Sequence, residues 1–357
     1  MMKNTRVIKI TIFISSILFL LLFQNTNYLI VKNTLALFLE NVMPSLFPFI
    51  LFTNIIISTD IISSLTSIFK KNYNIISLII IGFLCGYPMG AKATYKYFLD
   101  NKITKNDALY LMSFINNCNP IFIISTIGIC IFENIHIGII LLMSHYISAI
   151  LIGIYYYKSR SNIIHESEIK SNSFGKNSDK KLHKMDFFEI IDYSIKNTFV
   201  VLANILGFII IFNILFGLLE KFLITINIPI SIITLLSSTF EVTSGTKLLY
   251  FNSTFSENIT TSLISFALGF SGFSIIFQIY SCIHKLKIPI STLMKNKLIH
   301  GILSFILTYT FINVIPNKSI INFNIIHFSE ATYYLIVTSL LYLFVFSIKK
   351  VTHQLKK

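Results

Sequence analysis

Residues 85–95 read CGYPMGAKATY, which places two glycines, a proline and a lysine inside a long apolar segment. Residues 240–250 read FEVTSGTKLLY and repeat the order of Gly, a small residue, Lys and, three positions later, Tyr. Gly90 and Gly245 are 155 residues apart, and the same displacement carries residues 119–124 onto residues 274–279. A constant displacement without insertions over about 35 residues predicts that the chain is built from two related halves.

The composition predicts an integral membrane protein. Hydrophobic residues make up 54% of the 357 positions, charged residues only 12%, and 34 residues are Phe. Apolar runs of about 18 to 25 residues recur along the chain, which is the length that spans a bilayer. The net charge of +14 comes from basic residues between these runs, so it indicates topology rather than nucleic-acid binding. The four cysteines lie in apolar runs without metal-ligand spacing and read as packing residues.

The expected fold is an all-α polytopic membrane protein with about eight transmembrane helices and two re-entrant hairpins in an inverted repeat. The expected crossings are residues 10–23, 42–59, 108–131, 137–157, 198–219, 259–283, 298–315 and 331–348. The hairpins are residues 75–98 and 224–250, because helix-breaking backbone at membrane depth is tolerated only inside protein or along a cavity. Residues 25–40 are expected along the outer surface, and residues 186–197 as an amphipathic helix at the interface.

The charges of the loops predict which side of the membrane each loop faces. Nearly all Lys and Arg fall on one side when residues 75–98 turn back, which predicts cytoplasmic termini and hairpins that open to opposite sides. The expected units are a first membrane half, 1–157, a basic cytoplasmic linker, 158–185, and a second membrane half, 186–357. Pro44 and Pro48 either kink the crossing at 42–59 or start its helix.

Glu241 is the one carboxylate well inside an apolar region, where an ionised group costs ~2.5 to 3.5 kcal/mol. It is therefore a candidate site for a coupling ion or proton. The alternative is a structural carboxylate that pairs with Lys247 or caps a half-helix.

The repeated lysines and the polar residues beside them are candidate substrate ligands. Lys92 and Lys247, with the starts of the half-helices, would attract an anionic solute if the hairpin tips meet, although Lys92 also has the reach to extend to the interface. The other candidates are Gly86, Tyr87, Pro88, Asn116, Asn117, Asn119, Thr243, Ser244, Ser271 and Ser274. Their polar groups either bind substrate or satisfy the broken backbone.

No intramembrane carboxylate pair, nucleophile set or phosphate loop is visible in the sequence, so we expect neither an enzyme nor a cofactor or metal. The expected partners are the lipid bilayer and a small anionic solute, and the sequence leaves a homo-oligomer open.

Four segments carry a resemblance to a known family: residues 46–49, 86–92, 116–120 and 241–245. They resemble the sporulation integral membrane proteins of the YlbJ or SpoVV family, within the nucleoside-recognition or Gate domain group. That group is similar in plan to concentrative nucleoside transporters. The resemblance extends over residues 40–315 in matching order.

The resemblance implies a sporulation transporter in the outer forespore membrane that moves dipicolinic acid from the mother cell toward the spore. Two alternatives stay open: a carrier of a nucleoside-like solute, and a non-transporting membrane scaffold for spore-envelope assembly that depends on the basic linker.

Overall fold

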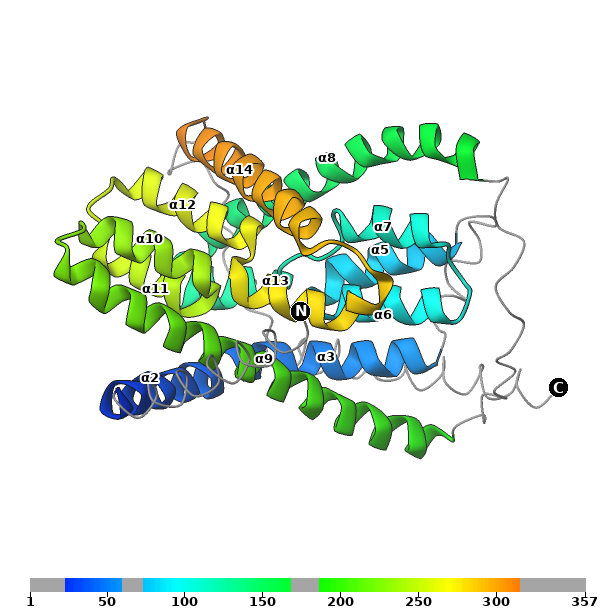
Figure 1. Ribbon diagram of the computed structural model, residues 1–357, viewed down its shortest axis with the longest axis horizontal. Coiled ribbons are helices and arrows are strands. Elements are labelled where there is room, and N and C mark those ends of the chain that lie inside the picture. Colours follow the sequence, from blue (N-terminus) through cyan, green and yellow to red (C-terminus); the bar gives the residue numbers. More distant parts are fainter. Residues whose placement is uncertain (1–22, 60–72, 168–185, 315–357) are drawn as a thin grey trace, which may run out of the picture. The chain divides into compact units, whose positions relative to one another are not determined.

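The computed structural model describes residues 23–59, 73–167 and 186–314, with the backbone alone for 158–167. Every regular element in these ranges is a helix, which confirms the predicted all-helical class for them (Figure 1). Nearly all of the first expected crossing, the last crossing, both termini and most of the basic linker lie outside the described residues.

The first half begins with three helical segments that follow each other without interruption: α2 (Gln24–Leu37), the π-helical turn η1 (Phe38–Val42) and α3 (Met43–Ser58). A pair of short helices comes next, α5 (Tyr73–Cys85) and α6 (Met89–Leu99). The half continues through α7 (Lys105–Met112), a non-helical stretch at residues 115–119, the π-helical segment η3 (Phe122–Ile129) and α8 (Ile135–Ser167).

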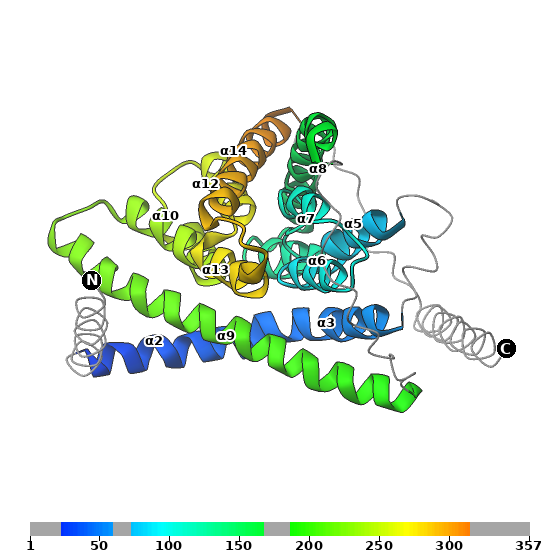
Figure 2. The ribbon, with the colours of Figure 1, turned by 45° about the vertical axis from the view of Figure 1, so that its right-hand side comes forward.

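The second half starts with the long helix α9 (Phe187–Thr225), which runs beside α2 and α3 in both Figure 1 and Figure 2. A second pair of short helices follows, α10 (Ile230–Phe240) and α11 (Val242–Asn252). Then come α12 (Glu257–Phe270), α13 (Gly272–Ile283), the 3-10 turn η4 (His284–Leu286) and α14 (Ile290–Val314).

Five helical stretches are long and apolar enough to cross a membrane: residues 24–58, 135–157, 187–225, 257–286 and 290–314. Each corresponds to one expected crossing, although the stretch 257–286 is broken at Ser271, where α12 ends and α13 begins. The expected crossing at 108–131 is not a continuous helix, because Asn-rich residues 116–119 and Pro120 interrupt it. Asn side chains compete for backbone hydrogen bonds and proline lacks a donor, so both oppose an unbroken helix here.

Two other boundaries differ from expectation. Residues 25–40 are not a separate surface element, because they continue through η1 into α3, and Pro44 lies in the first turn of α3. Residues 186–197 do not form a separate interfacial helix. Asp186 and Glu189 make a capping box, and the helix then runs unbroken to Thr225, since no proline follows before Pro229.

Close glycine contacts explain the repeated motif. In the first pair, a Cβ added to Gly90 on α6 would lie 3.1 Å from Cα of Gly82 on α5. In the second pair, a Cβ on Gly245 of α11 would lie 2.3 Å from Cα of Ser238 on α10. The repeated glycine therefore lets the two helices of each pair pack backbone against backbone. Their re-entrant placement in a membrane stays a prediction.

The tip of each helical pair is the non-helical connection between its two helices, residues 86–88 in the first pair and Glu241 in the second. Each tip crosses a non-helical break in the segment that follows it, at residues 115–119 and at Ser271. Gly86 has φ +71, and a Cβ there would lie 2.8 Å from the backbone nitrogen of Asn119. Gly272 has φ +66, and its Cβ would meet the Phe240 carbonyl oxygen at 3.3 Å. Gly86 and Asn117 are 31 residues apart, as are Glu241 and Gly272. The duplication seen in the sequence thus extends to how tip and break pack.

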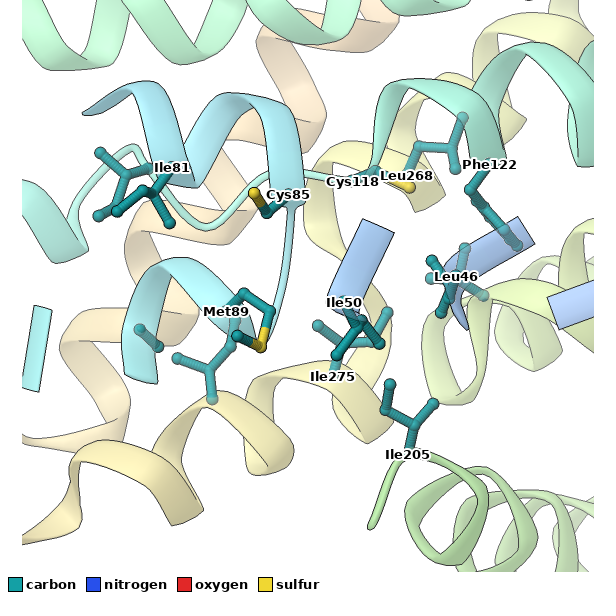
Figure 3. Packing of buried hydrophobic residues seen from close by; sticks show 14 of the residues in the cluster. Leu46, Ile50, Ile81, Cys85, Met89, Cys118, Phe122, Ile205, Leu268 and Ile275 are labelled. Carbon is teal, nitrogen blue, oxygen red and sulfur yellow. The ribbon is translucent and has the colours of Figure 1, made fainter. Parts of the chain in front are cut away.

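The core surrounds these tips and breaks. Figure 3 shows side chains of both halves in one cluster, with Met89 of the first tip, Cys118 of the first break and Ile275 of α13 among them. Leu46 and Ile50 of α3 and Ile205 of α9 belong to the same cluster. Both breaks therefore lie inside protein, where broken backbone is tolerated in a membrane protein.

Candidate functional site

A small cavity lies where both tips and both breaks meet. Five predicted site residues line it: Tyr87, Asn119, Glu241, Thr243 and Ser274. Cys118 and Gln278 complete the polar lining, and the apolar wall comes from Val42, Leu46, Phe122, Ile205, Ile209 and Ile275. The cavity thus joins residues of both halves that are far apart in the sequence.

The cavity offers a space of water size. Its volume is ≈ 30 Å³, enough for a water molecule. Pockets that hold small organic ligands measure roughly 300 Å³ or more. The two halves must therefore move apart at the tips before a larger solute can enter.

Glu241 caps the second half-helix of its pair. Its carboxylate accepts hydrogen bonds from the Thr243 amide at 3.0 Å and the Ser244 amide at 2.7 Å, while the residue is only 1% exposed. These bonds satisfy two of the backbone donors that the break leaves free at the start of α11. One of the two interpretations that the sequence left open, a capping carboxylate, therefore describes the observed contacts. A role with a coupling ion stays a prediction.

Lys247 lies away from this cavity. It is exposed and lines a larger hollow of ≈ 530 Å³ together with Glu40, Glu220 and Asn213. Ser244 connects the two sites, because it also lines the hollow and its hydroxyl lies 2.8 Å from both Glu241 Oε2 and Asn213 Oδ1.

Lys92 is held by a chain of amide contacts between three helices. Its amine donates to Asn197 Oδ1 of α9 at 2.8 Å, and the Asn197 amide donates to Asn54 Oδ1 of α3 at 2.7 Å. Asn54 in turn donates to Thr198 Oγ1 at 3.1 Å. The structure thus does not bring Lys92 and Lys247 together at the cavity, and their role in substrate binding stays a prediction.

The first break is held in place by groups from three other elements. The Tyr87 amide donates to the Asn117 carbonyl at 2.9 Å, and the Cys118 amide donates to His145 Nε2 of α8 at 3.0 Å. The Lys297 amine of α14 donates to the Asn116 carbonyl. Backbone groups that a helix would have paired are therefore satisfied by a tip and by buried side chains.

Several buried amides near the first break lack a hydrogen-bond partner. They are Asn116 Oδ1, both amide atoms of Asn117, Asn119 Nδ2 and Gln278 Nε2. Leaving such a group unpaired costs roughly 1–3 kcal/mol, so water or a bound solute is its expected partner. The Asn119 and Gln278 side chains line the cavity, which gives it two free donors.

The remaining predicted residues shape the backbone. Pro88 precedes α6 and follows a cis peptide bond from Tyr87. Ser271 adopts a left-handed conformation, φ 71, at the break between α12 and α13, and its hydroxyl donates to the Leu268 carbonyl at 3.3 Å. Pro88 belongs to the first tip and Ser271 to the second break, and neither lines the cavity.

Sequence reasoning missed three buried polar residues, namely Lys297, His300 and Gln278. Lys297 was taken as a loop residue because the crossing was expected to begin at residue 298, whereas α14 begins at Ile290. The signal was present: Lys297, His300, Ser304 and Thr308 recur at helical spacing, and all four are buried. A polar face on an apolar helix points to an interior contact.

No protein-family model matches the chain, and no solved structure matches it. One curated protein does: "Sporulation integral membrane protein YlbJ" of Bacillus subtilis (strain 168). The two are 27% identical over 308 residues, which cover 76% of this chain and 74% of that protein. The chain is therefore similar to YlbJ over most of both lengths, and its apolar helices are those of an integral membrane protein, so the resemblance seen in the sequence is confirmed.

Proposed function

We propose that the chain is a carrier for a small polar solute, working by alternate opening of the cavity between its two halves. The observation that supports this most is the meeting of two tips and two breaks at one cavity with free amide donors. Broken helices in matching positions of two repeats are the arrangement in which secondary transporters bind their substrates.

The small cavity fits one state of such a cycle. A carrier passes through a form in which the binding site is contracted, and a water-sized cavity suits that form. The larger hollow beside it reaches Ser244, which is hydrogen-bonded to Glu241 in the cavity lining. Separation of α11 from α9 at the Ser244–Asn213 contact would connect hollow and cavity, so we propose the hollow as one entry route.

Dipicolinate, moved across the outer forespore membrane, is the cargo that we propose first. The family resemblance and the sporulation name of the relative support it. Its carboxylates need hydrogen-bond donors, and the Asn119 and Gln278 amides offer them. The α6, α11 and α13 half-helices all start at the tips and breaks, and helix starts attract negative charge.

A nucleoside-like solute is the second candidate, and one observation favours it. The cavity is lined by amide and hydroxyl groups and by Glu241, while Lys92 and Lys247 both lie elsewhere. A lining without these lysines suits an uncharged solute that hydrogen-bonds on several edges.

Uptake into vesicles that contain only the purified chain tests the proposal. We expect labelled dipicolinate to enter protein-containing vesicles faster than empty ones and unlabelled dipicolinate to compete. Competition by nucleosides, with no effect of dipicolinate, would select the second candidate. Uptake of neither solute above that of empty vesicles would contradict the carrier.

A matched pair of amide variants connects any uptake to the cavity. Gln278→Ala removes a free donor in the cavity, and we expect about tenfold lower uptake at low solute concentration, the loss of one hydrogen bond to cargo. Asn313→Ala removes an exposed amide at the end of α14 and should leave uptake unchanged. Equal uptake by the two variants would place the solute elsewhere.

A further inference from the structure

Three buried titratable side chains gather between α8, α14 and the first break. Lys297, His300 and His145 are 8%, 2% and 0% exposed. The two imidazole rings lie 4.4 Å apart, centre to centre, and Lys297 is three residues before His300 on α14. Neither the cap at Glu241 nor the expected lysine pair involves them.

Lys297 is a cation site without an acidic partner. Its amine donates to the Asn116 carbonyl, and no Asp or Glu in the described part of the chain lies within ion-pair distance of it. A buried ammonium group without a counter-charge carries a large free-energy penalty, so such a lysine exchanges its proton readily or pairs with an incoming anion.

The hydrogen bonds determine which imidazole nitrogens carry protons. His145 Nε2 accepts from the Cys118 amide, so the proton of the neutral ring is on Nδ1. His300 Nε2 lies 2.9 Å from the His145 carbonyl and must donate to it, so its Nδ1 is free to accept a proton. Protonation of His145 at Nε2 would break its bond to Cys118, whereas protonation of His300 breaks no hydrogen bond seen in the structure.

Both contacts act on the segment that lines the cavity. Lys297 holds the Asn116 carbonyl and His145 holds the Cys118 amide, while Cys118 and Asn119 form part of the cavity wall. Lys297 and His300 belong to the second half, and the segment that they reach belongs to the first. The Glu241 carboxylate, by contrast, bonds to the start of its own helix and reaches α9 through Ser244.

We propose that Lys297, with the His145–His300 pair, is the proton site that couples cargo movement to a pH gradient. This rests on the proposed carrier function. The amine of Lys297 takes a proton from water on one side of the membrane and releases it to water on the other side, and cargo crosses in the same cycle. If the cargo is an anion, its negative charge and this proton favour each other's binding reciprocally.

The surroundings leave few other groups for this role. The first break presents Cys118 and α8 presents Tyr146 and Tyr156, whose hydroxyls donate to the Phe83 carbonyl and Asn296 Oδ1. α12 contributes Ser265, which is hydrogen-bonded to Ser304 and Thr308 of α14. Lys297 and the two histidines are thus the basic groups of this contact region.

The test separates coupling from binding. In vesicles with an acidic exterior, wild-type chain should concentrate labelled dipicolinate, by up to about tenfold per pH unit for one proton per molecule carried. Lys297→Gln should lose this accumulation and still exchange external labelled dipicolinate for internal unlabelled dipicolinate. Lys295→Gln, on the exposed face of the same helix, should accumulate cargo like wild type.

A second variant keeps the test informative if Lys297→Gln does not fold. His300→Gln retains a donor for the His145 carbonyl but has no basic nitrogen, so we expect the pH dependence of accumulation to shift while exchange continues. Accumulation driven by a sodium gradient alone, or pH-driven accumulation that survives both changes, would overturn the coupling site and leave the carrier intact. Failure of wild-type chain to move any cargo would overturn both.

Discussion

Replacing Gly245 by alanine is expected to destabilise the folded chain by at least ~3 kcal/mol, beyond the usual range for a single added methyl group. The new Cβ would lie 2.3 Å from Cα of Ser238 and 2.4 Å from its backbone nitrogen. Backbone atoms in a packed interior cannot move aside as a flexible side chain can, so α10 and α11 would have to separate. Thermal unfolding of the purified chain in detergent measures the loss.

Gly207 provides the matched control. It lies in α9, and a Cβ added there would meet nothing within 4 Å. Gly207→Ala should therefore stabilise the helix by about 0.5–1 kcal/mol or leave it unchanged. Equal unfolding temperatures for the two variants would contradict the close packing of the second helical pair.

Glu241→Ala is expected to lower both stability and uptake. The change leaves the Thr243 and Ser244 amides without their acceptor at a site that is 1% exposed. Two unpaired buried donors cost about 2–5 kcal/mol together, and α11 would lose the contact that fixes its first turn. Because Glu241 also lines the cavity, we expect uptake to fall to the level of empty vesicles.

Two further variants separate the cap from the charge. Glu241→Gln keeps one side-chain oxygen as an acceptor, so we expect it to retain a large part of the stability. Glu257→Ala removes an exposed carboxylate from the first turn of α12 and should unfold like wild type. If Glu241→Ala also unfolded like wild type, the cap would contribute nothing and a purely ionic role would be favoured.

The sequence predicted both helical pairs because their motifs contain helix breakers at a constant displacement. Gly86, Gly90 and Gly245 stand where backbone conformation or close approach excludes a side chain, and that requirement is visible in residue type alone. The cavity residues Tyr87, Asn119, Glu241, Thr243 and Ser274 followed from the same pattern, since tips and breaks meet.

The roles of the lysines did not follow from the pattern. Lys92 and Lys247 occupy matching positions in the repeat, yet one bonds to Asn197 and the other is exposed in the larger hollow. Equivalent positions in a repeat share a backbone environment, but their side-chain partners come from other helices. Lys297 was missed because its crossing was expected to begin at residue 298, and its partner, the Asn116 carbonyl, is far away in the sequence.

The sequence pattern also did not show where a helix is continuous and where it is interrupted. Apolar periodicity marks where a helix packs, and it does not show whether a polar stretch interrupts the helix or extends it. Residues 186–197 extend α9, whereas residues 115–119 interrupt the segment between α7 and η3. The second case depends on acceptors and donors from the Tyr87 tip, His145 and Lys297, which only the folded chain brings together.

Thiol cross-linking across the cavity tests directly whether the first break and the second tip meet. In a chain with Cys85, Cys130 and Cys282 replaced by alanine, Cys118 and a Thr243→Cys substitution would face a cavity of ≈ 30 Å³. A short bifunctional thiol reagent should join them, with the linked peptides identified by mass spectrometry, while Leu248→Cys on the exposed side of α11 should give no such product. Linkage of Cys118 to position 248 rather than to position 243 would contradict the convergence of the two halves.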